Sequence, residues 1–371
     1  MVDPVRLAFV GCGNCLHISF GPVLSFVEGL DVVAAVDPLP ENLAAARSGY
    51  GIAAGYESLE ECLDNEAIDA ALIAAPVQLH RNLAVMCAER GIHVMLEKPM
   101  ARTVTECDEI ISAHEQAGTT LMLGLMKRYN RSMLAVADLL ESGSIGQIMG
   151  VRHNWDWGGA QEAISAGWRG SLDTWGGQWQ DHGAHSVDLA NWWAGPVSSV
   201  MAVFDRTEPG WEVENEYNVI CTHQNGVRST HQSTKNYHKP NEEHYLIFGD
   251  CGTVELRHRS TVWQYTTPYE VAIHRFGNRS EDHQPAFCSN WLEEARRFGQ
   301  YKIELDHFVQ CLREGSRPRT DGASGRAAVE VITAAYLSAI ERREVCLPLT
   351  TTPDIEGFFA QLPARVPERL R

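Results

Sequence analysis

Carboxylate and imidazole side chains gather in one glycine-rich segment of this sequence, 176–188. Asp181 and His185 are four residues apart, so on a helix they would share a face, and the carboxylate would fix one imidazole tautomer and raise its basicity. Such a histidine can take the proton of an alcohol near neutral pH. We expect His182 to face outward. Asp188 would either cap or orient His185 or be an ordinary helix carboxylate, and we favour the second role. The four side chains have suitable types for a metal site, but an outward His182 disfavours one.

A lysine in another segment, Lys98, is a candidate to act on the substrate oxygen. It stands in the string Glu97-Lys98-Pro99, directly after a short apolar run. Its ammonium would donate to a substrate oxygen and stabilise alkoxide-like charge, or it would share the proton transfer. The sequence leaves open whether Lys98 or His185 is the base.

A glycine turn near the N-terminus has the context of a dinucleotide-binding motif. Gly11 and Gly13 follow an apolar run and precede an expected helix, where glycine lets backbone N–H groups approach a pyrophosphate. Leu16 departs from the pattern, because Gly or Ala there would allow the closest packing of helix on strand. Asp37 ends the second apolar run, where a carboxylate accepts hydrogen bonds from ribose hydroxyls and repels a 2′-phosphate. With no Lys or Arg between Asp37 and Arg47, the prediction is NAD rather than NADP.

Two other interpretations of this turn remain open. The glycines also suit a doubly wound fold that binds a different ligand. Cys12 and Cys15 form a C-x-x-C pair, which at a helix N-terminus is typical of a redox-active thiol. We disfavour the redox pair, since both cysteines lie where a pyrophosphate would bind.

Tryptophan is concentrated around the acidic and imidazole segment. Indole faces pack against the C–H faces of sugar rings while polar groups bond the hydroxyls, so this density suggests a sugar site. We expect at least one of Trp192 and Trp193 to be core, and the loop-like members to form the wall of the site. Seven of the ten tryptophans fall in this region: Trp155, Trp157, Trp168, Trp175, Trp179, Trp192 and Trp193.

The charge of this region indicates the class of substrate. Between 151 and 197 the basic side chains other than histidine are Arg152 and Arg169, and a phosphorylated sugar would require more positive charge. We therefore predict a neutral sugar, anhydrosugar or cyclitol, with Arg169 as the one residue that would instead recognise a carboxylate. The candidate substrate contacts, besides Asp181 and His185, are Lys127, Asn154, Trp168 and Arg169.

Length and composition set the wider limits. The 371 residues exceed one ordinary core and favour two domains, and the formal charge of -17 would repel nucleic acid or an anionic membrane. We see neither a signal peptide nor an apolar run long enough to span a membrane. The ten cysteines are spread through apolar segments, which is typical of buried thiols in a reducing cytoplasm.

The elements that must position these residues follow from hydrophobic periodicity. Short apolar runs alternate with amphipathic stretches through residue 126, which predicts an α/β domain with a doubly wound parallel sheet (1–126). The second domain, 127–371, is expected to combine helices with antiparallel strands that have one covered face. The first domain's expected strands are 6–10, 31–36, 70–74, 93–96 and 120–125, with a helix near 79–90. The second domain's expected elements are helices near 132–141, 304–312 and 326–340, a strand over 148–155, and strands within 198–275.

Several short strings, in this order, resemble the Gfo/Idh/MocA family, which includes glucose-fructose oxidoreductase and inositol dehydrogenase. The resemblance covers nearly the whole chain. The strings that carry it, behind the glycine turn, are Ala75-Pro76-Val77-Gln78-Leu79-His80, Glu97-Lys98-Pro99, Lys127-Arg128, Ser142-Gly143-Ser144-Ile145-Gly146, Gly176 through Asp188, and a C-terminal run from Asp306-His307-Phe308 through Gly325-Arg326 to Leu347-Pro348.

The resemblance implies both a fold and a chemistry. It implies an N-terminal Rossmann domain and a C-terminal α/β domain with an open, mostly antiparallel sheet, whose exposed face often makes a dimer or tetramer contact. The implied activity is NAD-dependent or NADP-dependent oxidation or reduction of a sugar or polyol carbinol. It places Lys98 beside the nicotinamide and makes Asp181 and His185 the catalytic pair, with no need for a metal. The expected cofactor contacts are Gly11, Gly13, Asn14, Cys15, Asp37, Pro76, His80, Glu97 and Lys98.

Three functions are consistent with the residues. The favoured one is an NAD-dependent sugar or polyol dehydrogenase. A second retains NAD and cleaves glycosides through transient oxidation and elimination, and only net consumption of NAD separates it from the first. The third is a non-catalytic sensor of NAD or sugar on the same scaffold.

Overall fold

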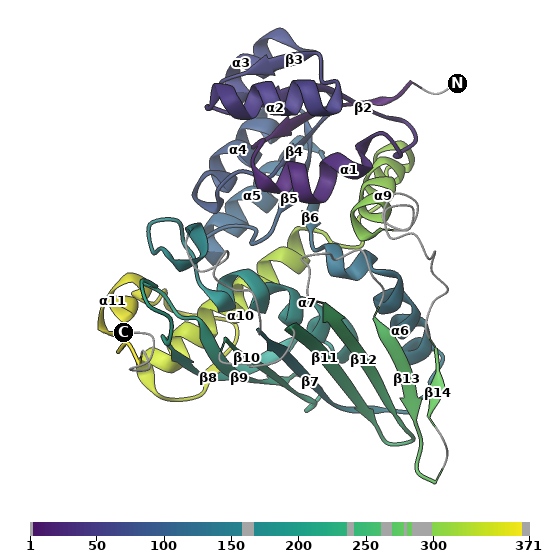
Figure 1. Ribbon diagram of the computed structural model, residues 1–371, viewed down its shortest axis with the longest axis vertical. Coiled ribbons are helices and arrows are strands. Elements are labelled where there is room, and N and C mark those ends of the chain that lie inside the picture. Colours follow the sequence, from purple (N-terminus) through teal and green to yellow (C-terminus); the bar gives the residue numbers. More distant parts are fainter. Residues whose placement is uncertain are drawn as a thin grey trace. The chain divides into compact units, whose positions relative to one another are not determined.

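The computed structural model describes residues 3–157, 167–235, 241–260, 269–277, 280–283 and 299–365. These residues form two compact units (Figure 1). Of the described chain, 3–129 and 299–326 belong to unit 1, and the remainder to unit 2. The chain therefore returns to unit 1 near its C-terminal end. The domain boundary at residue 126 stays a prediction.

Unit 1 contains the predicted Rossmann sheet, six parallel strands in the order β3-β2-β1-β4-β5-β6 among the described residues. The order reverses beside β1, and ligands of such sheets bind at the carboxyl ends of strands at this point. The sequence missed β3, which is three residues long and lacks a buried apolar run. The strands are β1 (Val5–Val10), β2 (Leu30–Val36), β3 (Ala54–Tyr56), β4 (Ala70–Ile73), β5 (His93–Glu97) and β6 (Leu121–Gly124).

Helices of unit 1 begin and end at residues that suit those positions. Ser58 and Thr103 cap two of them by accepting hydrogen bonds from backbone N–H groups three residues later. The core joins Phe9 of β1 and Leu72 of β4 to Phe308 of α9, so a C-terminal helix completes this core. The helical elements are η1 (Cys15–Phe20), α1 (Gly21–Leu24), α2 (Pro40–Tyr50), α3 (Leu59–Asn65), α4 (Val77–Glu89), α5 (Val104–Ala117), η2 (Met126–Tyr129) and α9 (Gln300–Glu314).

Unit 2 contains a nine-stranded sheet in the described residues, in the order β14-β13-β12-β11-β7-β10-β9-β8-β15. The described strands pair antiparallel except β7 with β10, so the predicted mostly antiparallel sheet is confirmed. The strands are β7 (Ile148–Asp156), β8 (Val197–Asp205), β9 (Glu216–His223), β10 (Arg228–Thr234), β11 (Asn241–Gly249), β12 (Thr253–Ser260), β13 (Glu270–His274), β14 (Glu281–Asp282) and β15 (Val345–Cys346).

Helices cover one face of this sheet. Val187 of α7 and Tyr336 of α10 pack with Phe204 of β8 in one core cluster, and Val136 of α6 packs with Ile247 of β11 in another. Two short turns, η4 (Trp168–Gly170) and η5 (Trp179–Gly183), precede α7. The helices are α6 (Arg131–Glu141), α7 (Ala184–Ala194), α10 (Gly322–Glu341, which begins in unit 1) and α11 (Ile355–Gln361).

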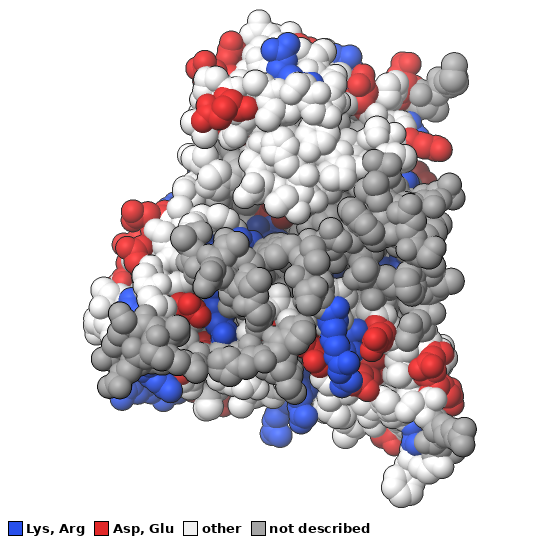
Figure 2. Space-filling model, viewed as in Figure 1, with Lys and Arg blue, Asp and Glu red and all other residues white. Residues whose placement is uncertain are grey.

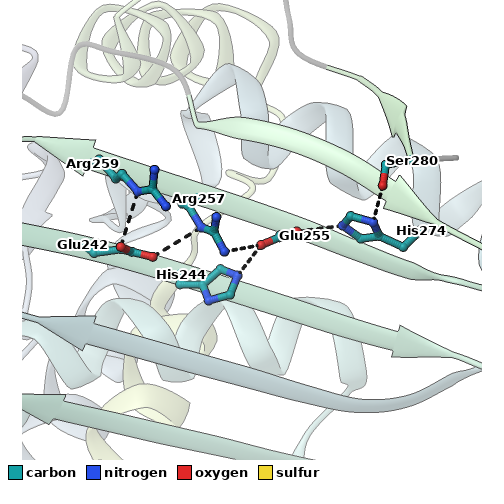
Figure 3. Close-up of polar contacts among 7 residues, drawn as sticks. All are labelled: Glu242, His244, Glu255, Arg257, Arg259, His274 and Ser280. Atoms are coloured by element: carbon teal, nitrogen blue, oxygen red, sulfur yellow. Dashed lines mark hydrogen bonds and ion pairs between the residues drawn. The ribbon is translucent and has the colours of Figure 1, made fainter.

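The opposite face of the sheet is open and has two ends of different character. On β8 and β9 it exposes Met201, Val203 and Ile220. On β11, β12 and β13 it carries a charged network in which Glu255 accepts from His244 Nε2 at 2.8 Å and from His274 Nε2 at 2.7 Å (Figure 3). The apolar end is the part of this face suited to a protein contact.

The surface charge and the length of the helices are relevant to binding of nucleic acid or a membrane. On the face shown in Figure 2, acidic and basic side chains are interspersed over the described surface. Within the described ranges, every helix is too short or too polar to cross a membrane.

Candidate functional site

The glycine turn of unit 1 has one glycine that the backbone requires and one that leaves space. Gly11 has a φ of +92°, and a Cβ there would lie 2.7 Å from the backbone of Ala74 at the end of β4. A Cβ on Gly13 would meet nothing within 4 Å. The turn therefore approaches β4 closely at Gly11 and stays open at Gly13, as a pyrophosphate site requires.

The helix after this turn begins unusually. Asn14 precedes a π-helical turn, η1, in which Cys15 is the first residue. Leu16, the departure from the family pattern, is fully buried and packs into the core of unit 1. Leu16 therefore serves as a core residue and does not intrude on the open space at Gly13.

Asp37 connects the second strand to the glycine turn. Its Oδ2 accepts from the backbone N–H of Cys12 at 2.8 Å, and its Oδ1 accepts from Leu39 N at 2.9 Å and Asn42 Nδ2 at 3.1 Å. The carboxylate is thus fixed at the carboxyl end of β2. A carboxylate has about four acceptor positions, so acceptor capacity is left for a ribose hydroxyl.

The two cysteines of the turn are poor candidates for redox chemistry. Burial is the main cause that raises the pKa of Cys12 to about 12 and the pKa of Cys15 well above its usual value. A thiol attacks as its thiolate, so neither cysteine is activated at neutral pH.

The loops after β4 and β5 are joined by a histidine. His80 is buried, with Nε2 2.9 Å from the carbonyl oxygen of Ala75 and Nδ1 3.0 Å from that of Pro99. Burial lowers its pKa. Both ring nitrogens face backbone carbonyls, so His80 fixes the loop that starts α4 after Pro76 and the loop that carries Lys98.

Lys98 follows a buried carboxylate. Its backbone N–H donates to Oε2 of Glu97 at 3.1 Å. The charges of Glu97 and Lys98 both act on the thiol of Cys15, so the lysine lies near the glycine turn. Glu304 of α9 is buried nearby, and burial first and the charge of Glu97 second raise its pKa well above the usual range.

In unit 2 the segment that carries Asp181 and His185 is buried. Asp181 lies in the π-helical turn η5 and His185 in the first turn of α7, so the two residues span a π-helical to α-helical junction rather than one regular helix. Arg169 Nε donates to Asp181 Oδ2 at 2.6 Å. Arg169, predicted to contact substrate, is therefore also an ion-pair partner of the acidic residue.

The expectation that His182 faces outward is wrong. Its side chain is buried, with its ring centroid 4.0 Å from that of Trp155 and 5.0 Å from that of Trp157. The two indoles stack at 5.7 Å. The wider π-helical turn rotates the chain less per residue than an α-helix does, which directs His182 inward, with Nε2 3.6 Å from Asp181 Oδ2.

The other predicted substrate contacts are placed differently. Trp168 is exposed, and the Arg169 guanidinium lies 4.5 Å from its ring centroid. Asn154 alternates with the buried Trp155 on β7 and lies on the open face opposite His244, so the structure does not bring Asn154 to the Trp155–His182 cluster. Lys127 is buried in unit 1, in η2.

The remaining tryptophans are mainly structural. Trp193 belongs to a core cluster and Trp192 packs against it, as predicted for at least one of the pair. Trp179 is fully buried in the other core cluster, and Trp175 packs against that cluster. Of the seven tryptophans singled out in the sequence, Trp155 and Trp157 contact His182, and Trp168 contacts Arg169.

Two family models match the chain in tandem. Residues 5–125 match an oxidoreductase family with an NAD-binding Rossmann fold, and residues 133–255 match the Gfo/Idh/MocA C-terminal domain. The chain belongs to the Gfo/Idh/MocA oxidoreductase family.

Known proteins are similar to this Gfo/Idh/MocA chain over nearly the full length of both chains. The D-apiose dehydrogenase of Paraburkholderia graminis is 28% identical, over 96% of this chain and 91% of its own. The scyllo-inositol 2-dehydrogenase (NAD(+)) of Bacillus subtilis is 22% identical, over 90% and 94%. The solved structure of the WlbA dehydrogenase from Bordetella pertussis, in complex with NADH and UDP-GlcNAcA, is similar with a TM-score of 0.77 and 28% identity, over 94% of this chain and all of that one.

Two residues of this Gfo/Idh/MocA protein were missed by sequence reasoning. Glu214 accepts from the backbone N–H of Trp179 at 2.7 Å and from Tyr336 Oη at 3.0 Å, and burial raises its pKa to about 8. Lys235, the residue directly after β10, has its ammonium 4.1 Å from the ring centroid of Trp211. Both residues lie in polar, strand-like sequence far from 176–188, so no local signal marked them.

The described residues also bear on a metal centre. They contain no group of three or more His, Cys, Asp or Glu side chains arranged to hold a metal ion. The donors that lie together near Asp181 include the cationic Arg169, which is unsuited to metal coordination.

Proposed function

We propose that this chain transfers a hydride between NAD and a carbinol carbon of a sugar, anhydrosugar or cyclitol, with Lys98, Asp181 and His185 acting on the reacting alcohol. The observation that carries the proposal is the buried Asp181, paired with Arg169 at 2.6 Å one turn before His185. The names of the relatives, which include D-apiose and scyllo-inositol dehydrogenases, support the alcohol chemistry.

The residues of unit 1 fit NAD. Gly11 and Gly13 would hold the pyrophosphate, with Asn14 and Cys15 at the start of the helix, and Asp37 would accept from the ribose. The absence of Lys and Arg from 38–46 favours NAD over NADP. Pro76, His80 and Glu97 would position the nicotinamide end of the site through the loops after β4 and β5.

The chain's own residues supply the proton chemistry. When bound, NAD accepts the hydride. His185 takes the hydroxyl proton, or Lys98 does, and the other stabilises the developing charge on oxygen. Asp181, held by Arg169, is the carboxyl group of this segment, and a carboxylate beside an imidazole favours the protonated form of that ring.

The assay is reduced-nicotinamide absorbance with NAD, then NADP, across neutral sugars, anhydrosugars, inositols and sugar acids. Turnover with NAD supports the dehydrogenase. Bound NAD with no net reduction by any member of the panel contradicts it and indicates the NAD-retaining glycosidase or the sensor. Cleavage of a glycoside without net NADH would then separate those two.

The roles of Lys98 and His185 are tested with Lys98→Met and His185→Ala. Loss of a general acid or base lowers kcat by about 100- to 10,000-fold. The variant that abolishes the pH dependence of hydride transfer identifies the base. Lys302→Met, which removes an ammonium paired with Asp306 on α9, is the control and should leave kcat unchanged. An active His185→Ala enzyme with an unshifted pH profile excludes histidine as the base.

We also propose that the protein is located in a reducing cytoplasm and assembles as a homodimer or homotetramer. The nine described cysteines are free, in agreement with a reducing compartment. The assembly is supported by the apolar end of the open sheet face.

A further inference from the structure

Lys235 is a buried cation in the described residues without a hydrogen-bonded or ion-paired acceptor there. Its side chain is only 7% exposed. The ammonium lies 4.1 Å from the ring centroid of Trp211 and 5.7 Å from that of Trp157. Indole faces attract a cation, but they do not replace the hydrogen bonds that an ammonium loses on burial.

Lys235 belongs to the same cluster of side chains as Asp181. Trp157 joins Lys235 to His182, whose ring centroid is 5.0 Å from the indole. His182 in turn lies 3.6 Å from Asp181. Arg169 acts electrostatically on Lys235 and pairs with Asp181. Lys235 and Asp181 therefore belong to one cluster of packed side chains.

The two cations of this cluster are partnered differently. Arg169 forms an ion pair with Asp181 at 2.6 Å, whereas Lys235 has no ion-pair partner among the described residues. Burial is the largest cause that lowers the pKa of Lys235 to about 8, with the Arg169 charge acting in the same direction and the Glu208 charge opposing it. A bound anion would reverse this effect, because it would favour the charged form of the lysine.

We propose that Lys235 binds a carboxylate of the substrate, so that the alcohol oxidised by this enzyme belongs to a sugar acid. The inference rests on the proposed function and refines its substrate class. A carboxylate monoanion matches a single free ammonium, whereas a phosphate dianion would require further donors, and Arg169 is already paired. The indoles of Trp157 and Trp211 border the same ammonium and are themselves buried, so they desolvate it and would strengthen its attraction to a bound anion.

Lys235 lies outside the segment from which a neutral substrate was predicted. That prediction used the basic residues between 151 and 197, where Arg152 and Arg169 occur. β10 pairs in parallel with β7, with Thr234 opposite Asp156, and so brings Lys235 beside Trp157. Segment composition could not include this distant cation.

The test compares each sugar acid with its own uncharged methyl ester. D-glucuronate, D-galacturonate and D-gluconate are assayed with NAD against the methyl esters, for wild type, Lys235→Met and Arg228→Met. Arg228 is an exposed cation at the other end of β10 and is the control for loss of charge. A charged hydrogen bond is lost in Lys235→Met, so kcat/KM for at least one acid should fall about 10- to 100-fold while its ester changes little.

Calorimetry gives a second measurement that does not require turnover. Near pH 8, binding of the acid to the NAD-loaded wild type should take up protons onto Lys235, and the Lys235→Met variant should lose this uptake. Equal kcat/KM for acid and ester in wild type, or an unchanged ratio in Lys235→Met, overturns the proposal while leaving the dehydrogenase intact. If nothing is turned over, proton-linked binding of an acid that depends on Lys235 supports the anion site alone, and its absence from all the acids overturns it.

Discussion

The carboxyl group of Glu214 accepts a hydrogen bond from the backbone N–H of Trp179, 35 residues earlier in the chain, at 2.7 Å. This contact caps the π-helical turn η5 that carries Asp181. It also explains a glycine, because a Cβ on Gly177 would lie 2.6 Å from the Glu214 carboxyl oxygens. The acidic residue of the site is thus positioned by a second acid that has no place in the sequence motif.

Replacement of Glu214 tests this support. Glu214→Gln retains an acceptor for the backbone N–H of Trp179 and should fold. Glu214→Ala leaves that N–H and the hydroxyl of Tyr336 without their acceptor and should lower the free energy of unfolding by roughly 1 to 3 kcal/mol. We also expect Glu214→Ala to lower kcat through displacement of Asp181. The measurements are urea unfolding and steady-state kinetics. Identical behaviour of the two variants would contradict a role for the acceptor.

The pH dependence of stability follows from the raised pKa of Glu214. Its pKa rises from 4.5 in the unfolded chain to about 8 in the folded protein, so the folded state holds a proton that the unfolded state releases. The contribution of this bound proton to the free energy of unfolding is fully present below pH 4.5 and is lost as the pH rises through about 8. Unfolding free energies should therefore fall less steeply with pH in Glu214→Gln than in wild type; parallel curves would refute this origin.

Asp37 should control the choice of cofactor. Asp37→Ala removes acceptors from both the ribose and the Cys12 N–H, so we expect kcat/KM with NAD to fall about 10- to 100-fold and the preference over NADP to shrink. Glu41→Ala, an exposed acid in the first turn of α2, is the control and should keep the wild-type ratio. An unaltered ratio in Asp37→Ala would mean that the carboxylate serves only the turn.

The two glycines of the turn should respond differently to alanine. Gly11→Ala forces an unfavourable φ and a contact with Ala74, so we expect a loss of roughly 2 to 3 kcal/mol in stability. Gly13→Ala meets no protein atom and should stay within about 0.5 kcal/mol of wild type, yet bind NAD more weakly, since the methyl group would occupy the space left for the pyrophosphate. Thermal unfolding and NAD titration separate the two effects, and equal destabilisation would show the distinction to be false.

The apolar end of the open sheet face should form the contact between subunits. Met201 pairs with Ile220 across β8 and β9, and Val203 is 60% exposed beside them. Val203→Lys with Ile220→Lys should reduce the molar mass measured by light scattering to that of a smaller assembly. Leu39→Lys, an equally polar change at an exposed apolar residue of unit 1, is the control. An unchanged mass in the double variant would move the contact elsewhere.

The local pattern of the sequence determined the Rossmann sheet and the positions of most helices. Strands buried on both faces, such as Phe9 to Val10 and Leu72 to Ile73, are continuous apolar runs, and the glycine turn follows the first of them. These features depend on neighbours in the chain, which is why periodicity reports them. The family strings added the order of the motifs, and the matched family models confirm the membership.

Only the tertiary structure decided the environment of the site. The π-helical turn, which buries His182, is capped by Glu214, and Lys235, the cation that we propose binds a substrate carboxylate, follows another strand. Glu304 likewise reaches Glu97 from a C-terminal helix. Each contact joins residues far apart in sequence, and desolvation and charge act through space, so no local pattern of residues could reveal them.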